Sequence, residues 1–122
     1  MKVVVTSSGK GLDAPVDQRF GRCPFFVIVD TGTGEYEDAP NGSAAASGGA
    51  GIAAAQQVAA KNPEAVLTGH CGPNAFNVLK ASKIGVYTGI TGSVRDAVAA
   101  FKAGTLQNIS GPDAESHTGM GR

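Results

Sequence analysis

The sequence lacks the features that mark several large classes of protein. Its 10 Lys and Arg balance its 10 Asp and Glu, so the formal net charge is zero. Nucleic-acid binding depends on neutralising phosphates with basic side chains, and this balance argues against it. No apolar stretch approaches the roughly 20 residues of a membrane span, and the opening MKVVVTSS lacks the long apolar segment of a signal peptide. We therefore expect a cytoplasmic globular protein.

Cysteine is scarce, whereas glycine is abundant. Only Cys23 and Cys71 occur, far apart in the chain, so neither a disulfide framework nor a CxxC pair is indicated. The 18 glycines are about twice the usual share. We expect backbone groups, more than side chains, to take part in recognition. The length of 122 residues allows one compact domain.

Apolar and β-branched runs predict five strands. They cover residues 2–7, 24–30, 34–39, 64–69 and 84–89. The short DTGTG between the second and third runs predicts a hairpin connection. Strands joined by a helix must run parallel, whereas hairpin strands run antiparallel. The order βββαβαβα therefore predicts an α/β fold with a five-stranded mixed sheet, its second strand antiparallel to the others and helices on both faces.

Three segments are predicted to form helices. They cover 50–61, 73–82 and a stretch from Val94 with apolar residues at i, i+3, i+4 and i+7. Ser93 and Asp96 form a capping-box-like start to the last helix, and Gly104 predicts its end. We expect residues 1–109 to form a single domain. Residues 110–122 have little to bury and predict a flexible C-terminal tail.

Ligands of such sheets collect beyond the carboxyl ends of the parallel strands. Three segments are predicted to meet there: TSSGKG after the first strand, TGHCGPN after the fourth and TGITGS after the fifth. Two of them lead into helices, whose first N–H groups are unpaired and favour an anion. The loop SGGAG before the first helix has the same chemistry, but the sequence does not settle whether it reaches the same edge.

Two local motifs have simpler interpretations. Gly49-x-Gly51-x-x-Ala54 satisfies a dinucleotide fingerprint formally, but it does not directly follow a strand, and a close-packing helix entry explains it better. His70 and Cys71 would be two ligands short of a four-ligand metal site. As adjacent residues they rarely point at one another, which argues against a nucleophile and base. They remain the candidates if any metal ligation is direct.

The motifs DQRFGRCPFFVIVD, GGAGIAAAQQVA, GHCGPNAFNVL and IGVYTG occur in this order. In their order and spacing the chain resembles the dinitrogenase iron–molybdenum cofactor biosynthesis family from residue 1 to about 106. That family includes small nitrogen-fixation cofactor carriers and the orange protein of sulfate reducers. The resemblance implies a ribonuclease H-like three-layer fold and non-covalent binding of an anionic metal–sulfur cluster, either a molybdenum–iron–sulfur cofactor precursor or a molybdenum–copper sulfide cluster. The resemblance thus makes residues 1–109 a single metal-cluster-binding domain, and it does not imply catalysis.

The residue chemistry agrees with such a ligand. A thiometallate is a large, soft anion whose sulfides accept hydrogen bonds, and arginine forks with glycine-flanked N–H groups are suitable donors. The predicted cluster-binding residues are Ser7, Ser8, Arg19, Phe20, Gly21, Arg22, Gly48, Gly49, Gly51, His70, Cys71, Gly72 and Asn74. Simpler roles stay open for two of them: Arg19 in a surface salt bridge with Asp17, and Phe20 in the core. Cys23 is expected to be a small buried residue at the start of a strand, with Arg22 the functional neighbour.

Three function classes remain. The first is a carrier or storage protein for the cluster. The second is a regulatory interaction protein acting with a P-loop ATPase or a cofactor-assembly protein, as the resemblance suggests. The third is a hydrolase on the same fold. Ribonuclease H chemistry needs several carboxylates holding two metal ions, yet the first predicted strand, KVVVTS, has no acidic residue.

Overall fold

The computed structural model describes residues 1–42 and 49–106. Five strands form one mixed sheet in the order β3-β2-β1-β4-β5. They are β1 (Lys2–Ser7), β2 (Phe25–Asp30), β3 (Tyr36–Pro40), β4 (Ala65–Leu67) and β5 (Gly85–Tyr87). β2 is antiparallel to β1 and β3, whereas β1, β4 and β5 run parallel. The predicted mixed sheet with a reversed second strand is confirmed, and the predicted tail, 110–122, lies outside the described residues.

β1 forms the centre of the sheet because its side chains are apolar on both faces. Val4 pairs with Ile28 of β2 on one side and with Val66 of β4 on the other. Successive side chains of a strand point to opposite faces. Val3 and Val5 therefore belong to one core and Val4 to the other. A continuous β-branched run suits such a doubly covered strand.

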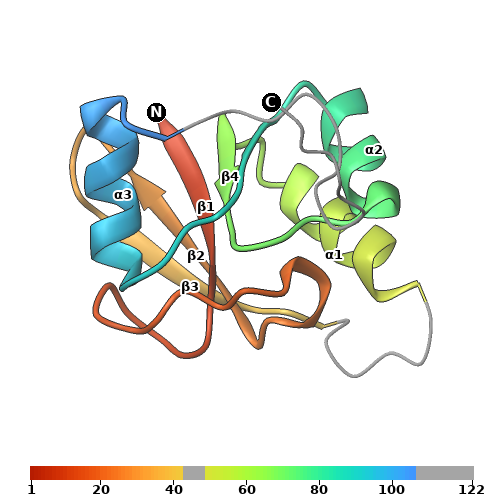
Figure 1. Ribbon diagram of the computed structural model, residues 1–122, viewed down its shortest axis with the longest axis horizontal. Helices are drawn as coiled ribbons and strands as arrows, with labels where there is room; N and C mark the ends of the chain where they lie inside the picture. The colour runs from red at the N-terminus through yellow and green to blue at the C-terminus, as the bar shows by residue number, and fades with distance from the viewer. Residues whose placement is uncertain (43–48, 107–122) are drawn as a thin grey trace.

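Helices cover both faces of the sheet, as predicted. α1 (Ala50–Ala59) and α2 (Pro73–Ala81) lie on one side of the sheet, and α3 (Val94–Ala103) lies on the other (Figure 1). The α1–α2 core, as we call the larger cluster, consists of Val4, Phe20, Cys23, Phe26, Ile28, Ala39, Ala54, Ala55, Val58, Val66, Cys71, Ala75, Phe76, Leu79, Ile84 and Val86. The α3 core includes Val3, Val5, Val16, Val27, Val29, Leu67, Ile90, Val94 and Ala97.

The predicted signals at both ends of α3 are confirmed. The Ser93 side chain accepts the backbone N–H of Asp96, and the Asp96 side chain accepts the backbone N–H of Ser93, which completes the capping box. Gly104 has a φ of 75°, in the left-handed region that glycine adopts readily. Within residues 1–42 and 49–106, no helix combines the length and apolar composition needed to cross a membrane.

A segment that sequence patterns did not reveal crosses the carboxyl ends of the parallel strands. This crossing segment, residues Pro15–Phe20, continues into a 3-10 turn at Phe20–Arg22. Its backbone hydrogen bonds are Val16 N–H to Gly92 C=O (2.9 Å), Asp17 N–H to Thr6 C=O (2.9 Å), His70 N–H to Gln18 C=O (2.8 Å) and Phe20 N–H to His70 C=O (3.3 Å). The segment therefore ties the loop before α3 to the loop before α2.

Candidate functional site

A groove opens where the crossing segment meets the first turns of α1 and α2. Its volume is about 330 Å³. It is lined by Gln18, Arg19, Phe20, Gly21, Gly51, His70, Gly72, Pro73, Asn74 and Ala75. These residues come from three segments far apart in the chain, and the backbone pairing between the crossing segment and the loop after β4 holds two of them together. The groove is thus a product of the tertiary fold at the carboxyl edge of the sheet.

The helix starts at this groove are not neutralised by side chains. Gly49 is the N-cap of α1 and Gly72 the N-cap of α2, and within the described residues neither helix start has a side-chain cap hydrogen bond or an acidic residue in its first turn. The first N–H groups of a helix have no partner inside the helix and carry the positive end of its dipole. Both first turns therefore offer donors and partial positive charge to a ligand in the groove.

Arg19 brings a guanidinium to the groove. Its side chain is 66% exposed and forms a salt bridge of 3.2 Å, Nη2 to Oδ2, with Asp17, whose side chain is only 7% exposed. The hydrogen bond to Asp17 is the main cause that raises the pKa of Arg19, and the carboxylate's charge adds to it. The salt bridge left open as a simpler role is therefore present. It holds the guanidinium at the groove instead of removing it.

Close backbone approaches explain two glycines around the groove. A Cβ atom built at Gly69 would lie 2.6 Å from Cα of Gln18, so the loop after β4 can pass the crossing segment only without a side chain. A Cβ atom at Gly21 would lie 3.0 Å from Cα of Gly51 in the first turn of α1. The glycines of the RFGR and GGAG motifs therefore bring the 3-10 turn against α1. This supports the interpretation of GGAG as a close-packing helix entry.

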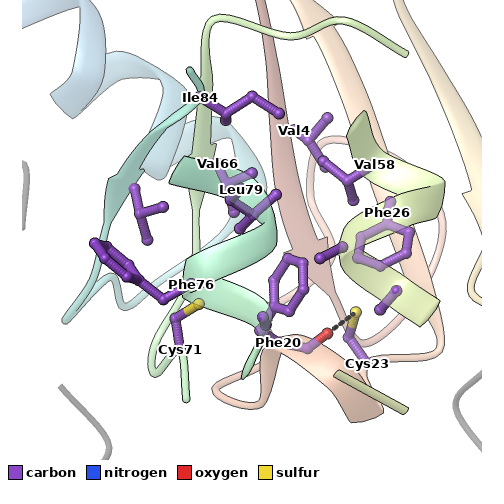
Figure 2. Close-up of a cluster of buried hydrophobic side chains, with 14 of the residues drawn as sticks. Val4, Phe20, Cys23, Phe26, Val58, Val66, Cys71, Phe76, Leu79 and Ile84 are labelled. Carbon is purple, nitrogen blue, oxygen red and sulfur yellow. Dashed lines mark hydrogen bonds between the residues drawn. The ribbon is translucent and has the colours of Figure 1, made fainter. Parts of the chain in front are cut away.

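Phe20 lines the groove, and both Phe20 and Cys23 pack in the α1–α2 core. Figure 2 shows Phe20 inside the α1–α2 core, with Cys23 and Cys71 on either side of it in this view. Phe20 is 2% exposed and Cys23 is 0% exposed, which confirms core packing for the first and a small buried side chain for the second. The Cys23 thiol donates to the Phe20 carbonyl at 3.3 Å. Burial, together with the negative charge of Asp17, raises the pKa of this thiol to about 12.

The structure separates the side chains of His70 and Cys71. His70 is exposed and lines the groove, whereas Cys71 is 0% exposed and packs in the α1–α2 core. Among the described residues no group of three or more His, Cys, Asp and Glu side chains is placed to hold a metal ion. The groove therefore offers one imidazole, but it does not offer the neighbouring thiol.

The predicted site residues divide into two groups. Those that line the groove are Arg19, Phe20, Gly21, Gly51, His70, Gly72 and Asn74. Those that the structure places elsewhere are Ser7, Ser8, Arg22, Gly49 and Cys71. Gly48 lies outside the described residues. Gln18, Pro73 and Ala75 line the groove without having been predicted, although each is a direct neighbour of a predicted residue.

The three predicted loops do meet at one edge of the sheet, but they do not all face the groove. The loop after β5 bonds to the loop after β4 through Gly89 N–H to Gly69 C=O (2.9 Å) and Ile90 N–H to Thr68 C=O (3.1 Å). None of residues 88–93 lines the groove, and Ile90 packs in the α3 core. The Ser7 hydroxyl donates to the Gly9 carbonyl at 2.6 Å. The loop after β1 thus forms a local turn.

Comparisons with known proteins place the chain among relatives that span most of its length. A family model described as dinitrogenase iron-molybdenum cofactor matches residues 1–104. The apo form of the orange protein from Desulfovibrio gigas is 43% identical, with a TM-score of 0.89 over 92% of this chain and 95% of that one. A NifB-like protein from Thermotoga is 34% identical, with a TM-score of 0.79 over 98% of each chain. An uncharacterized protein of Methanocaldococcus jannaschii is 31% identical over 93 residues, 74% of this chain and 79% of its own length.

Proposed function

This chain belongs to the dinitrogenase iron–molybdenum cofactor family, and from that premise we propose that it binds and carries an anionic molybdenum-containing metal–sulfur cluster without a covalent bond. The cargo is either an iron–molybdenum cofactor precursor or a molybdenum–copper sulfide cluster. One observation carries the proposal: the guanidinium of Arg19 and two helix starts that no side chain of residues 1–42 or 49–106 caps converge on one groove. This arrangement suits an anion.

The groove has the donors and the apolar surface that a thiometallate would need. Sulfides are large, polarisable acceptors, and backbone N–H groups at glycine-rich helix starts can approach them closely. Arg19 has five N–H donors, of which the Asp17 carboxylate accepts two, from Nε and Nη2. The Asn74 side chain adds amide donors, and Ala75 adds apolar contact. Binding of this kind needs no thiolate, and both thiols are buried.

The exposure of the groove residues suits a carrier. Arg19, His70 and Asn74 are all exposed, so a cluster held there can enter and leave without unfolding the domain. For the same reason we propose that the protein binds and releases its cargo and does not catalyse a reaction on it, because an exposed groove allows the cargo to exchange. A P-loop ATPase or a cofactor-assembly protein as the exchange partner stays a prediction. So does the grouping with ribonuclease H-like folds, which the strand order with one reversed strand supports.

The proposal is tested by titrating anaerobically purified protein with tetrathiomolybdate and copper(I), following charge-transfer absorption and bound molybdenum. We expect saturable binding. Arg19→Ala removes a charge-assisted contact of about 1.5–3 kcal/mol, which corresponds to a loss of affinity of at least tenfold. Arg95→Ala is the matched control, because Arg95 pairs with Asp13 on the surface and does not line the groove. It should leave binding unchanged.

Other outcomes would contradict the proposal in different ways. Failure of the wild-type protein to bind molybdenum would rule out the carrier function. A loss of the absorption bands in Cys71→Ala together with normal binding in Arg19→Ala would point to a ligated metal centre. The non-covalent mechanism would then be wrong, although a cluster-binding function would stand.

A further inference from the structure

We propose that Asp17 is a positioning and specificity residue of the groove: it holds Arg19 in place and offsets its charge, so that the site favours large thioanions over compact oxyanions. The inference rests on the proposed function and deepens it, because it names a property of the anion that the groove selects. It is carried by the contacts of Asp17, by the burial of its carboxylate and by the groups that anchor its backbone.

The contacts of Asp17 fix the orientation of the guanidinium. Oδ1 accepts the backbone N–H of Arg19 at 2.8 Å and its Nε at 3.2 Å, and Oδ2 accepts Nη2 at 3.2 Å. The Nε–Nη2 edge is one of the two edges with which an arginine grips a planar or tetrahedral oxyanion. In this protein a carboxylate of the chain already occupies that edge. A ligand in the groove meets only the remaining donors.

The backbone of Asp17 is held in place by hydrogen bonds to buried groups. The Asp17 N–H donates to the Thr6 carbonyl at 2.9 Å, and the Asp17 carbonyl accepts the Thr6 hydroxyl at 2.7 Å. The Thr6 hydroxyl has one proton and lies 2.8 Å from the Thr68 hydroxyl, so it accepts from Thr68 while it donates to Asp17. Both threonines are 0% exposed. The backbone of Asp17 is therefore anchored to Thr6 at the end of β1 and, through it, to Thr68 directly after β4.

The charge of Asp17 acts on its surroundings as well as on its partner. Its side chain is 7% exposed, so its charge is less screened by water than that of a surface carboxylate. Its charge contributes to raising the pKa of the Cys23 thiol as well as that of Arg19. An anion in the groove therefore meets a guanidinium whose charge is partly offset by a carboxylate 3.2 Å away.

An offset charge affects two kinds of anion differently. A compact oxyanion such as molybdate or phosphate is strongly hydrated and leaves water only for an unpaired cation that provides short, charge-assisted hydrogen bonds. A thioanion spreads the same charge over larger, less hydrated sulfur atoms. It gains more from apolar contact and from several weak N–H donors. The Asp17–Arg19 pair therefore penalises the oxyanion more than the thioanion, which gives the groove its preference.

The test compares Asp17→Asn with the wild-type protein, using tetrathiomolybdate and molybdate as separate probes. Asparagine keeps an acceptor for the Arg19 N–H but removes the charge. We expect the molybdate affinity to rise about tenfold, as expected when one unit of nearby opposing charge is lost at the edge of a protein. The tetrathiomolybdate affinity should change by less than about threefold. Asp13→Asn is the matched control, because it makes the same charge change in the exposed pair with Arg95 and should leave both affinities unchanged.

Two further variants keep the test decisive. Asp17→Glu keeps the negative charge that Asp17→Asn removes. The ratio of the two affinities should therefore stay close to the wild-type value, which a purely structural role of Asp17 would not predict. If Asp17→Asn does not fold, Asp17→Ser serves in its place, since its hydroxyl also accepts the Arg19 N–H. An unchanged ratio in these charge-removing variants, with normal thiomolybdate binding by the wild type, would overturn this inference alone. Absence of thiomolybdate binding in the wild type would overturn the proposed function and this inference with it.

Discussion

The starts of α2 and α3 occupy equivalent places in the fold but differ in chemistry. Each helix follows a parallel strand, β4 or β5, and begins at the same edge of the sheet. At α3, Ser93 and Asp96 satisfy the first N–H groups with a capping box. At α2, Gly72 is the N-cap, Pro73 follows it, and the described residues provide no side-chain cap and no acidic residue in the first turn.

This difference indicates which of the two helix starts is available to a ligand. A capping box typically stabilises a helix by about 1 kcal/mol, and α2 goes without that contribution. The α2 start opens on the groove, where a ligand can supply the negative charge, whereas none of residues 88–93 before α3 lines the groove. We interpret the uncapped start of α2 beside Arg19 as a feature that serves binding, and the capped start of α3 as one that serves stability. Four predictions follow from this difference, ordered by expected effect.

The largest effect is expected where the two helix starts are tied together. Gly69→Ala places a Cβ atom 2.6 Å from the Gln18 backbone, so the crossing segment must move. Overpacking of this kind costs about 1–3 kcal/mol or more, and we expect the upper end because backbone must shift. Urea unfolding measures the loss. Gly72→Ala is the control, since a Cβ atom there meets nothing within 4 Å and should cost less than about 1 kcal/mol.

The second prediction makes the α2 start more like that of α3. Asn74→Asp adds an acidic residue to the first turn of α2 at nearly constant size. The negative charge should stabilise the helix by about 0.3–1 kcal/mol. It should also weaken thiomolybdate binding by about tenfold, because Asn74 lines the groove and loses its amide donors there, whereas Asp17 does not line it. Thermal unfolding and the absorption titration measure the two effects. Equal or tighter binding by this variant would show that the α2 start does not face the ligand.

The third prediction weakens the α3 start. Ser93→Ala removes the side chain that accepts the Asp96 N–H and should lower the free energy of unfolding by about 1 kcal/mol. Thiomolybdate affinity should not change, because Ser93 does not line the groove. Denaturant unfolding and the titration test both statements. A parallel loss of affinity would mean that the two helix starts are coupled through the crossing segment.

The smallest effect is expected for the Cys23 thiol, because its ionisation does not change the stability near neutral pH. Burial raises the pKa of Cys23 from an ordinary value of 9.0 to about 12, so the folded state binds this proton more tightly than the unfolded state. The resulting stability is fully present below about pH 9 and is lost as the pH rises toward 12. We expect the melting temperature to fall less steeply between pH 9 and 11 in Cys23→Ala than in the wild type. Identical slopes would mean that the thiol is not buried.

Much of the fold was predictable because its signals are local. The β-branched run of β1, the DTGTG hairpin and the capping box of α3 each act within a few residues, and the structure has all three. Strand limits were less accurate: the predicted strand 34–39 is observed as Tyr36–Pro40, and the predicted 64–69 as Ala65–Leu67. The ends of these strands depend on pairing with neighbours, which propensity does not describe.

The site was predictable in its location but not in its composition. Loops after parallel strands had to meet at one edge, which predicts the position of His70 and Asn74, whereas Arg19 was expected there only from the family resemblance; all three line the groove. Arg22 and Cys71 belong to the same motifs, yet they do not line the groove. The direction of a side chain in an irregular segment depends on backbone dihedral angles, which the crossing segment sets through hydrogen bonds to distant residues. Hydrogen bonds of this kind leave no periodic pattern in the sequence from which they could be predicted.

The amino-acid sequence by itself therefore determined the order of elements, the two apolar faces of β1 and the glycines that permit close approach, because these follow from local conformation and side-chain periodicity. Only the tertiary structure decided that Asp17 would hold Arg19 at the groove and that Phe20 and Cys71 would turn into the core. Those outcomes depend on contacts between residues about 50 positions apart, such as Gln18 with His70. Such contacts form only when the sheet and both helix layers are assembled.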